Sequence, residues 1–355
     1  MKNFVYTIQP QRVVFGDGAI ARLPDEVEAL GAHRAIVLCT PHQRAEGERA
    51  AQLLGERCAG VFDEAAMHVP VEVARRAQAC AVQFRADCAV AIGGGSTIGL
   101  GKAIALETGL PVLAVPTTYA GSEMTPIYGI TEDGLKRTGR DVRVLPRTVL
   151  YDPTLSLGLP VAMSVTSAMN AIAHAAEGLY AQDANPVMSL MAEEGIRALG
   201  RAIPGIHAAP TDAAARADGL YGAWLCGMVL GNVGMALHHK LCHTLGGSFD
   251  LPHAEVHTVV LPHSMAYNAE AAPEAMRAIQ RALGLKVGTS AAAGLYDLAH
   301  RHGAPVALRD LGMRAEDVKR AVDIALTNPY WNPRPVMREP LHALLDAAYA
   351  GRRPE

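Results

Sequence analysis

The first 150 residues alternate short apolar runs with longer helical patterns, and this alternation constrains the fold more than any other feature of the chain. Runs rich in Val, Ile, Leu and Ala occupy residues 35–39, 88–92 and 111–115, and another, 148–153, ends at a proline. Helices are predicted over 71–83 and from about Thr97 onward. Apolar strands separated by helices are typical of βαβ units, in which helices cover both faces of a parallel sheet.

Beyond about residue 155 the pattern changes to one dominated by Ala, Leu and Met. Apolar residues recur at helical spacing over 164–182, 187–202 and 213–239. A chain of 355 residues is long enough for two domains. We therefore predict an α/β domain with a parallel sheet over residues 1–155 and an all-α domain over residues 156–355.

Charge and cysteine usage exclude several classes of protein. The 32 basic and 35 acidic residues leave a net charge of −3, which gives no electrostatic reason to bind nucleic acid or an anionic membrane. The six cysteines contain no CxxC pair and are expected to be reduced thiols. No signal peptide or membrane-spanning stretch is predicted, so we expect a soluble cytoplasmic protein.

A glycine-rich loop and a polar loop follow neighbouring apolar runs. Gly93, Gly94, Gly95 and Ser96 come directly after the run that ends at residue 92, and Thr117 and Thr118 follow the next one. Glycines let the backbone approach a ligand, and the unpaired amides at a helix N-terminus favour an anion such as a pyrophosphate. Ligands of open parallel sheets bind beyond the carboxyl ends of the strands. The two loops therefore predict a nucleotide site, with a ligand-free glycine turn as the alternative.

The helical half carries a group of histidines at helical spacing. Asn170, His174 and Glu177 fall at i, i+4 and i+7 and share one predicted helix face. His239 and His243 repeat the i, i+4 spacing on a second helix, which we expect to break at residues 246–247, before His253 and His257. Such imidazoles can hold a metal, move a proton or present a cation to an anionic substrate. His238 and His263 are interpreted as structural.

These motifs together resemble the iron-containing (group III) alcohol dehydrogenase superfamily and, within it, the maleylacetate reductases. The resemblance rests on GGGSTIGLGK (93–102), PTTYAGSEMTP (116–126), TGRD (138–141), MNAIAH (169–174) and NPYWNPRP (328–335). It implies a dinucleotide-binding domain, a helical domain, an active site in the cleft between them, and a homodimer. It also implies that NADH or NADPH binds at residues 93–96, Thr117 and Thr118. The implied reaction reduces the carbon–carbon double bond of maleylacetate, a dicarboxylate, to give 3-oxoadipate in the degradation of aromatic and chloroaromatic compounds.

The resemblance also locates the family's metal positions. In metal-dependent members one aspartate and three histidines hold the ion, and their counterparts here are Asn170, His174, His239 and His253. Gly99 stands where many members carry another aspartate, and His257 where many carry asparagine. Replacing a carboxylate by a neutral amide removes a charge pair worth about 4 kcal/mol at an effective dielectric constant near 20. We therefore expect vestigial metal positions and no metal requirement. The alternative is an Fe- or Zn-dependent dehydrogenase of a small alcohol or aldehyde.

The resemblance also suggests roles for individual residues. His243 and His253 are predicted to supply the proton or stabilise the developing enolate, with His174 and His239 in support. Asn170, Tyr330 and Arg334 are predicted to bind the substrate, since guanidinium groups match carboxylates. The alternative is that residues 328–335 only anchor the last helices.

The sequence leaves the cofactor preference and the role of several residues open. Residues 40–43 offer no carboxylate to repel a 2′-phosphate, so both NADH and NADPH are expected to bind. The basic residues Arg137, Arg140 and Arg143 form either a solvated face or a ligand contact. A metallohydrolase with Glu177 as base, and a nucleotide-binding protein without activity, are the remaining alternatives.

Overall fold

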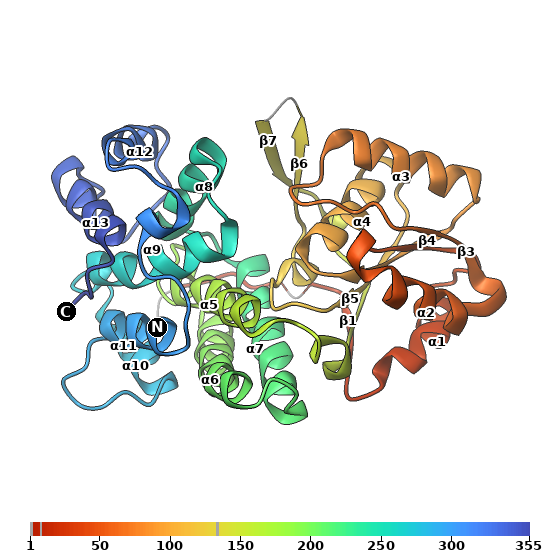
Figure 1. Ribbon diagram of the computed structural model, residues 1–355, viewed down its shortest axis with the longest axis horizontal. Helices are drawn as coiled ribbons and strands as arrows, with labels where there is room; N and C mark the ends of the chain where they lie inside the picture. Colours follow the sequence, from red (N-terminus) through yellow and green to blue (C-terminus); the bar gives the residue numbers. More distant parts are fainter. Residues whose placement is uncertain (1–2, 8, 133–134) are drawn as a thin grey trace. The chain divides into compact units, whose positions relative to one another are not determined.

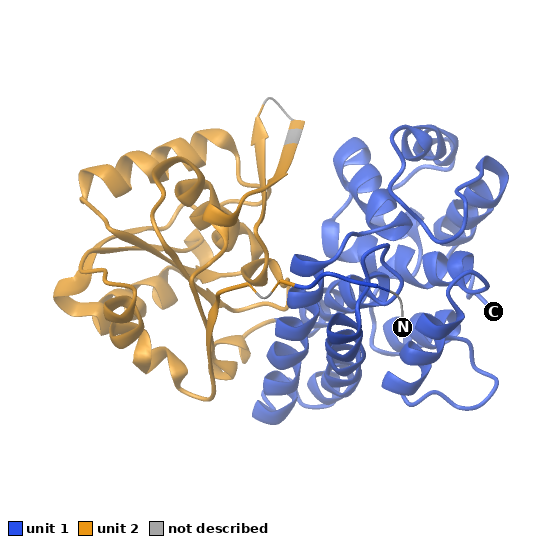
Figure 2. Ribbon diagram, turned by 180° about the vertical axis from the view of Figure 1, so that it is seen from behind, with its two compact units in different colours: residues 1–6, 160–355 blue, residues 7–159 orange. Residues whose placement is uncertain are grey.

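The computed structural model describes residues 3–7, 9–132 and 135–355, and the chain divides into two compact units (Figure 2). One unit is formed by residues 7–159, and the other combines residues 1–6 with residues 160–355. The sequence pattern predicts a change near residue 155. It gives no indication that the first residues belong with the helical unit.

The α/β unit is built on a six-stranded sheet in the order β1-β8-β5-β4-β2-β3, and every pairing in it is parallel. The strands are β1 (Arg12–Phe15), β2 (Ala35–Leu38), β3 (Cys58–Phe62), β4 (Cys88–Gly93), β5 (Val112–Pro116) and β8 (Thr148–Tyr151). The predicted α/β class with a parallel sheet is confirmed. The four strands expected from the apolar runs are β2, β4, β5 and β8, and they lie at the centre of the sheet with buried residues throughout.

Helices cover both faces of this sheet (Figure 1). They are α1 (Leu23–Ala29), α2 (Arg44–Leu54), α3 (Val71–Gln83) and α4 (Gly95–Thr108). Leu23 of α1 and Leu54 of α2 share one core with Val37, Val90 and Leu113 of the strands. Successive strand residues point to opposite faces, so the alternate positions of the same strands face α4.

Contact between α4 and the sheet depends on one glycine. A Cβ atom placed on Gly101 would lie 3.3 Å from Ala91 Cβ, 3.3 Å from Val112 Cγ1 and 3.7 Å from Leu38 Cδ1. The helix therefore rests directly on the strands at this position.

A two-stranded antiparallel hairpin was not predicted. It consists of β6 (Ile127–Glu132) and β7 (Leu135–Arg140), and it carries Arg137 and Arg140. Arg137 pairs with Glu132, and Arg143 beyond the hairpin pairs with Asp141. These arginines are exposed, as expected for a solvated face.

The second unit is all helical in its described parts. Its helices are α5 (Val161–Gly178), α6 (Pro186–Ala208), α7 (Ala213–Asn232), α8 (Leu237–Phe249), α9 (His253–Asn268), α10 (Pro273–Ala282), α11 (Ala291–Arg301), α12 (Asp317–Leu326) and α13 (Arg338–Ala350). Helix α9 packs against α5, α8, α11 and α13, so it forms the centre of the unit. Most of its residues after the first turn are buried.

Two details of the helical pattern differ from the expectation. The segment 213–239 is not one helix, because α7 ends at Asn232 and α8 begins at Leu237 after a bend of 97°. The glycines at 246–247 do not end α8, which continues to Phe249. Buried Leu241 and Leu245 hold this helix in the core, and such packing overrides the poor helix propensity of glycine.

No single helix in the described ranges is long and apolar enough to cross a membrane. By length and composition alone, α7 and α8 meet that test only as a bent pair.

The close contact at Gly101 yields a stability prediction. We expect Gly101→Leu to lower the free energy of unfolding by about 1–3 kcal/mol, because the added side chain overpacks the interface between α4 and the sheet. Gly158→Leu is the control, since a Cβ at Gly158 meets no atom within 4 Å. Urea denaturation measures both variants. Equal stabilities of the two would contradict the proposed contact.

Candidate functional site

The glycine loop lies at the carboxyl end of β4, between the loops that follow β2 and β5. Gly93 has φ +151°, and a Cβ there would lie 2.6 Å from Thr97 Oγ1 and 2.8 Å from Gln43 Oε1. A Cβ on Gly94 would lie 3.0 Å from Thr118 Cγ2. Only glycine fits at the first of these positions, and helix α4 begins at Gly95 with its first amides free of a side-chain cap. This bare backbone at a helix N-terminus fits a pyrophosphate.

Gln43 connects the two loops on either side of the glycine loop, and the sequence did not identify it. Its Nε2 donates to Thr117 Oγ1 at 2.9 Å, and Thr40 Oγ1 donates to its Oε1 at 3.3 Å. The side chain thus joins the loop after β2 to the loop after β5. The sequence contained one signal of this, a polar segment directly after an apolar run.

A buried lysine holds the remainder of the loop that follows β5. The Lys102 ammonium, on α4, donates to the carbonyl oxygens of Ser122 at 2.6 Å, Thr125 at 2.8 Å and Ile127 at 2.8 Å. Lys102 is fully buried, and burial lowers its pKa to about 7. The contacts fix the end of the segment that begins with Thr117.

Three helices of the second unit bring five imidazoles together, which we call the histidine cluster: His174 of α5, His239 and His243 of α8, and His253 and His257 of α9. Ring centroids are 5.2 Å apart for His174 and His239, 5.0 Å for His239 and His257, and 4.5 Å for His253 and His257. His174, His239 and His257 are buried, whereas His243 and His253 are exposed. The residues that the helical spacing selected therefore do meet in space.

Several polar atoms of this cluster and of Asn170, which lies one turn before His174 on α5, are buried and have no hydrogen-bond partner among the described residues. They are Asn170 Oδ1, His174 Nδ1, His239 Nε2 and His257 Nε2. Buried polar groups are normally paired, so a concentration of unpaired atoms indicates a place for a polar ligand. Burial, and then the neighbouring imidazoles, lower the pKa of His174 and His257 well below the usual range. These two rings are neutral near pH 7, so the cationic character expected of uncoordinated histidines does not extend to them.

Glu177, on the same face of α5, is completely buried and fully engaged. Its oxygens accept from the backbone amides of Ala236 at 2.8 Å and His238 at 2.7 Å, and Oε2 lies 2.7 Å from His239 Nδ1. A carboxylate surrounded by donors in the protein interior is a poor general base for a substrate or a water molecule. The geometry therefore gives no support to the metallohydrolase alternative.

The three histidines at the family's metal positions do not form a compact group of ligand atoms in this structure. Tetrahedral coordination at about 2.0–2.1 Å places ligand atoms roughly 3.4 Å apart. Within the described ranges, the His, Cys, Asp and Glu atoms close enough to share an ion belong to His238, Cys242 and His257, and the metal-position histidines do not form such a group. In that group His238 Nε2 lies 2.9 Å from His257 Nδ1, which is a hydrogen bond. His238 is thus paired with His257 inside the helical unit, and its interpretation as a structural residue stays a prediction.

The segment after α12 reaches the histidine cluster through a tyrosine. Tyr330 Oη lies 3.0 Å from His243 Nδ1. Asn332 exchanges two side-chain hydrogen bonds, of 2.7 and 2.9 Å, with the buried Asn268 at the end of α9. These bonds hold the segment against α9 and place Tyr330 beside His243.

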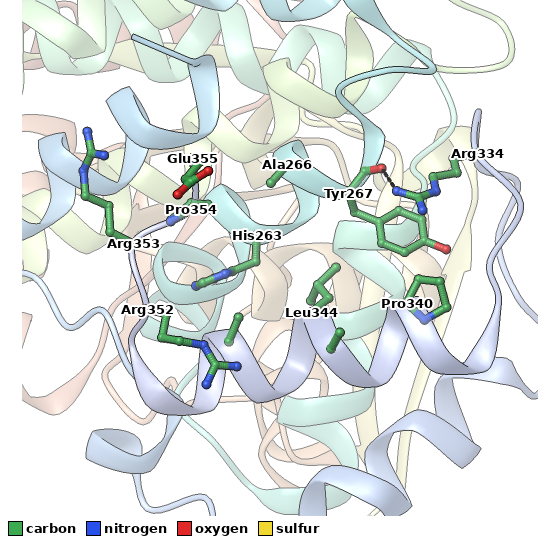
Figure 3. A pocket seen from close by; sticks show the side chains of 12 residues that line it. His263, Ala266, Tyr267, Arg334, Pro340, Leu344, Arg352, Arg353, Pro354 and Glu355 are labelled. Carbon is green, nitrogen blue, oxygen red and sulfur yellow. Dashed lines mark hydrogen bonds between the residues drawn. The ribbon is translucent and has the colours of Figure 1, made fainter.

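Arg334 lies elsewhere. Its guanidinium sits 4.4 Å from the centre of the Tyr267 ring and donates to the Tyr267 carbonyl oxygen at 2.9 Å (Figure 3). It lines an open cavity of about 440 Å³ with His263, Leu344 and Arg352. His263 and Tyr267 follow His257 by about two and three turns of α9, so Arg334 is some 15 Å along the helix from that ring. The structure shows Arg334 anchoring its own segment.

Comparison with known proteins agrees with this architecture. Residues 10–153 match the iron-containing alcohol dehydrogenase family, and residues 164–349 match the C-terminal region of the Fe-containing alcohol dehydrogenase family. The chain belongs to the iron-containing alcohol dehydrogenase family and is an oxidoreductase.

Within that family the resemblance to the maleylacetate reductases is confirmed. The chain is 61% identical to the maleylacetate reductase of Burkholderia cepacia over 354 residues, which cover 100% of both chains. It is 58% identical to that of Pseudomonas knackmussii over 99% of both. A crystal structure of the maleylacetate reductase from Agrobacterium tumefaciens, 54% identical, superimposes with a TM-score of 0.96 over 100% of both chains.

Proposed function

We propose that this protein uses NADH or NADPH to reduce the carbon–carbon double bond of maleylacetate, giving 3-oxoadipate. The observation that carries the proposal is the full-length similarity to several maleylacetate reductases. The glycine cradle with Thr117 and Thr118 supports a dinucleotide, and the unpaired polar atoms around Asn170 support a polar substrate.

Bound NAD(P)H supplies a hydride. Such a hydride, lost from the nicotinamide ring to leave NAD(P)+, would add to the alkene carbon remote from the ketone. The substrate would then carry the negative charge on the ketone oxygen as an enolate, and the chain's own residues would have to stabilise that oxygen and deliver a proton to the carbon next to the carbonyl. Donors aimed at the enolate oxygen stabilise its charge. His243 and His253 are exposed and suited to deliver the proton, and Tyr330 orients His243. Asn170 and Tyr330 serve as substrate contacts, with His174 and His239 in support.

We further propose that the reaction needs no metal. Asn170 supplies a neutral oxygen where the family's ion is held by a carboxylate, and the metal-position histidines are not gathered for coordination. Arg334 keeps the role of an anchor: through its segment it holds Tyr330 at His243, and it acts on the substrate only indirectly.

The direct test is an assay of NADH and NADPH oxidation at 340 nm with maleylacetate, and with acetaldehyde and butanal as comparison substrates. We expect rapid oxidation of either cofactor with maleylacetate, unchanged after exhaustive chelation, and formation of 3-oxoadipate. Faster reduction of the aldehydes, lost on chelation, would instead support the metal-dependent alcohol dehydrogenase.

The two exposed histidines give a kinetic prediction. His243→Ala or His253→Ala is expected to lower kcat about 100-fold or more if the removed ring supplies the proton. His300→Ala, at the surface end of α11, is the control and is expected to leave kcat unchanged. Turnover close to that of the unmodified enzyme in both cluster variants would remove His243 and His253 from the mechanism.

Restoring the carboxylate tests the electrostatic argument. We expect Asn170→Asp to increase retention of Fe²⁺ or Zn²⁺, measured by elemental analysis, because the new charge adds about 4 kcal/mol of attraction at an effective dielectric constant near 20. The same charge should raise KM for the dianionic substrate. If Asn170→Asp neither gains metal nor alters KM, the Asn170 amide does not determine whether the site prefers a dianionic substrate or a metal ion.

Cofactor binding tests whether Gln43, which joins the loops after β2 and β5, organises the nucleotide site. Gln43→Ala is expected to weaken NADH binding several-fold, because Thr117 loses the hydrogen bond that positions it. Gln78→Ala is the matched control: it removes a hydrogen bond of 3.1 Å to the Ala103 carbonyl oxygen in the same unit. Titration of NADH fluorescence measures the Kd of both. Equal Kd values in the two variants would show that Gln43 does not organise the site.

A further inference from the structure

Glu177 is buried at the end of α5, and most of its hydrogen bonds come from the start of α8; the Tyr180 hydroxyl also donates to Oε1 at 3.4 Å. Its oxygens accept from the backbone amides of Ala236, His238 and His239, at 2.8, 2.7 and 3.4 Å. Helix α8 begins at Leu237, and its N-cap residue Ala236 provides no side-chain cap. The free amides of a first helical turn require acceptors, and a negative charge there also interacts favourably with the helix dipole. Glu177 therefore caps α8 from a different helix.

The same carboxylate fixes one imidazole of the histidine cluster. Oε2 of Glu177 lies 2.7 Å from Nδ1 of His239, and both side chains are almost completely buried. A carboxylate accepts hydrogen bonds, so the proton of a neutral His239 must sit on Nδ1. The lone pair is then on Nε2, the atom that is buried and has no partner among the described residues. Glu177 thus determines both the tautomer of His239 and the direction in which Nε2 points.

The cap and the imidazole contact are linked through the chain. His239 lies in the first turn of α8, and His243 follows it one turn later, beside Tyr330. A carboxylate that fixes the first turn of α8 therefore also fixes the position of His243 on the next turn. Asn170 lies two turns before Glu177 on the same face of α5. One side chain therefore sets the relative positions of the α5 and α8 groups of the site.

We propose that Glu177 is a positioning residue for the reduction, acting through His239: it holds the ring in the Nδ1–H tautomer and orients its Nε2. The proposal rests on the proposed function. It assigns Glu177 no contact with substrate or cofactor.

The kinetic test is a double-mutant cycle with Glu177→Gln and His239→Ala. Glutamine keeps the size of the side chain but replaces one acceptor oxygen by an amide donor. We expect kcat with maleylacetate to fall roughly 10- to 100-fold in Glu177→Gln, by analogy with the range found for partners that orient metal-binding histidines, while KM for NADH stays unchanged. Because Glu177 acts through His239, the double variant should be no slower than His239→Ala alone.

A matched control separates positioning from simple destabilisation. Asn185 is buried and caps α6 by accepting from the Met188 amide at 3.1 Å. Asn185→Ala removes a helix cap in the same unit without touching the histidine cluster. It is expected to lower Tm like Glu177→Gln and to leave kcat unchanged. A kcat within twofold of normal in folded Glu177→Gln, or multiplying effects in the double variant, would overturn the proposal.

A measurement on the unmodified protein covers the case in which Glu177→Gln does not fold. With ¹⁵N-labelled histidine, the resonances of His239 are assigned by their loss in His239→Ala, and the bonded proton identifies the tautomer. We expect the proton on Nδ1, and a proton on Nε2 would refute the inference. This readout needs no turnover. If the protein does not reduce maleylacetate but His239 is Nδ1–H, the proposed reaction is wrong while the role of Glu177 as the group that fixes His239 stands.

Discussion

The bond between the Glu177 carboxylate and the start of α8 is the interaction on which the helical site depends. Burial of a carboxylate is costly unless donors surround it, and here backbone amides and an imidazole do so. The same contacts satisfy a helix terminus that lacks a side-chain cap of its own. The Glu177 carboxylate thus serves both stability and the proposed function. It accepts hydrogen bonds from the first amides of α8, and it orients the ring of His239.

Because Glu177 is fully hydrogen-bonded, mostly to α8, the side chain of Asn170 decides the charge at this part of the site. With the carboxylate occupied by α8, the unpaired atoms of Asn170, His174 and His257 are neutral acceptors or donors. A second carboxylate about 7 Å from a substrate carboxylate would cost roughly 2 kcal/mol at an effective dielectric constant near 20. A neutral amide avoids this repulsion and removes the charge that a divalent ion requires. Under the proposed function, the amide at position 170 therefore favours a dianionic substrate over a cation.

The sequence predicted the elements whose burial is complete and missed those whose burial is partial. β2, β4, β5 and β8 are apolar because helices cover them on both sides, and they were recognised. β1 and β3 lie at the sheet edges, where most residues are exposed or only partly buried, and no residue of β6 in the hairpin is fully buried. The continuation of α8 through its glycines was mispredicted for a related reason: tertiary packing of Leu241 and Leu245 decided the outcome.

Helical spacing was enough to find the histidine cluster, since residues at i and i+4 share a face whatever the helix packs against. It could not give a long side chain its direction. Arg334 had the right chemistry for a carboxylate, but the ring and carbonyl oxygen of Tyr267 hold its guanidinium about three turns along α9 from His257. Gln43 shows the converse, because the only signal for it in the sequence was its place in a polar segment directly after an apolar run. Gln43 lies in the site because β2 and β5 flank β4, which brings its side chain to Thr117. The strand order of the sheet cannot be read from the sequence.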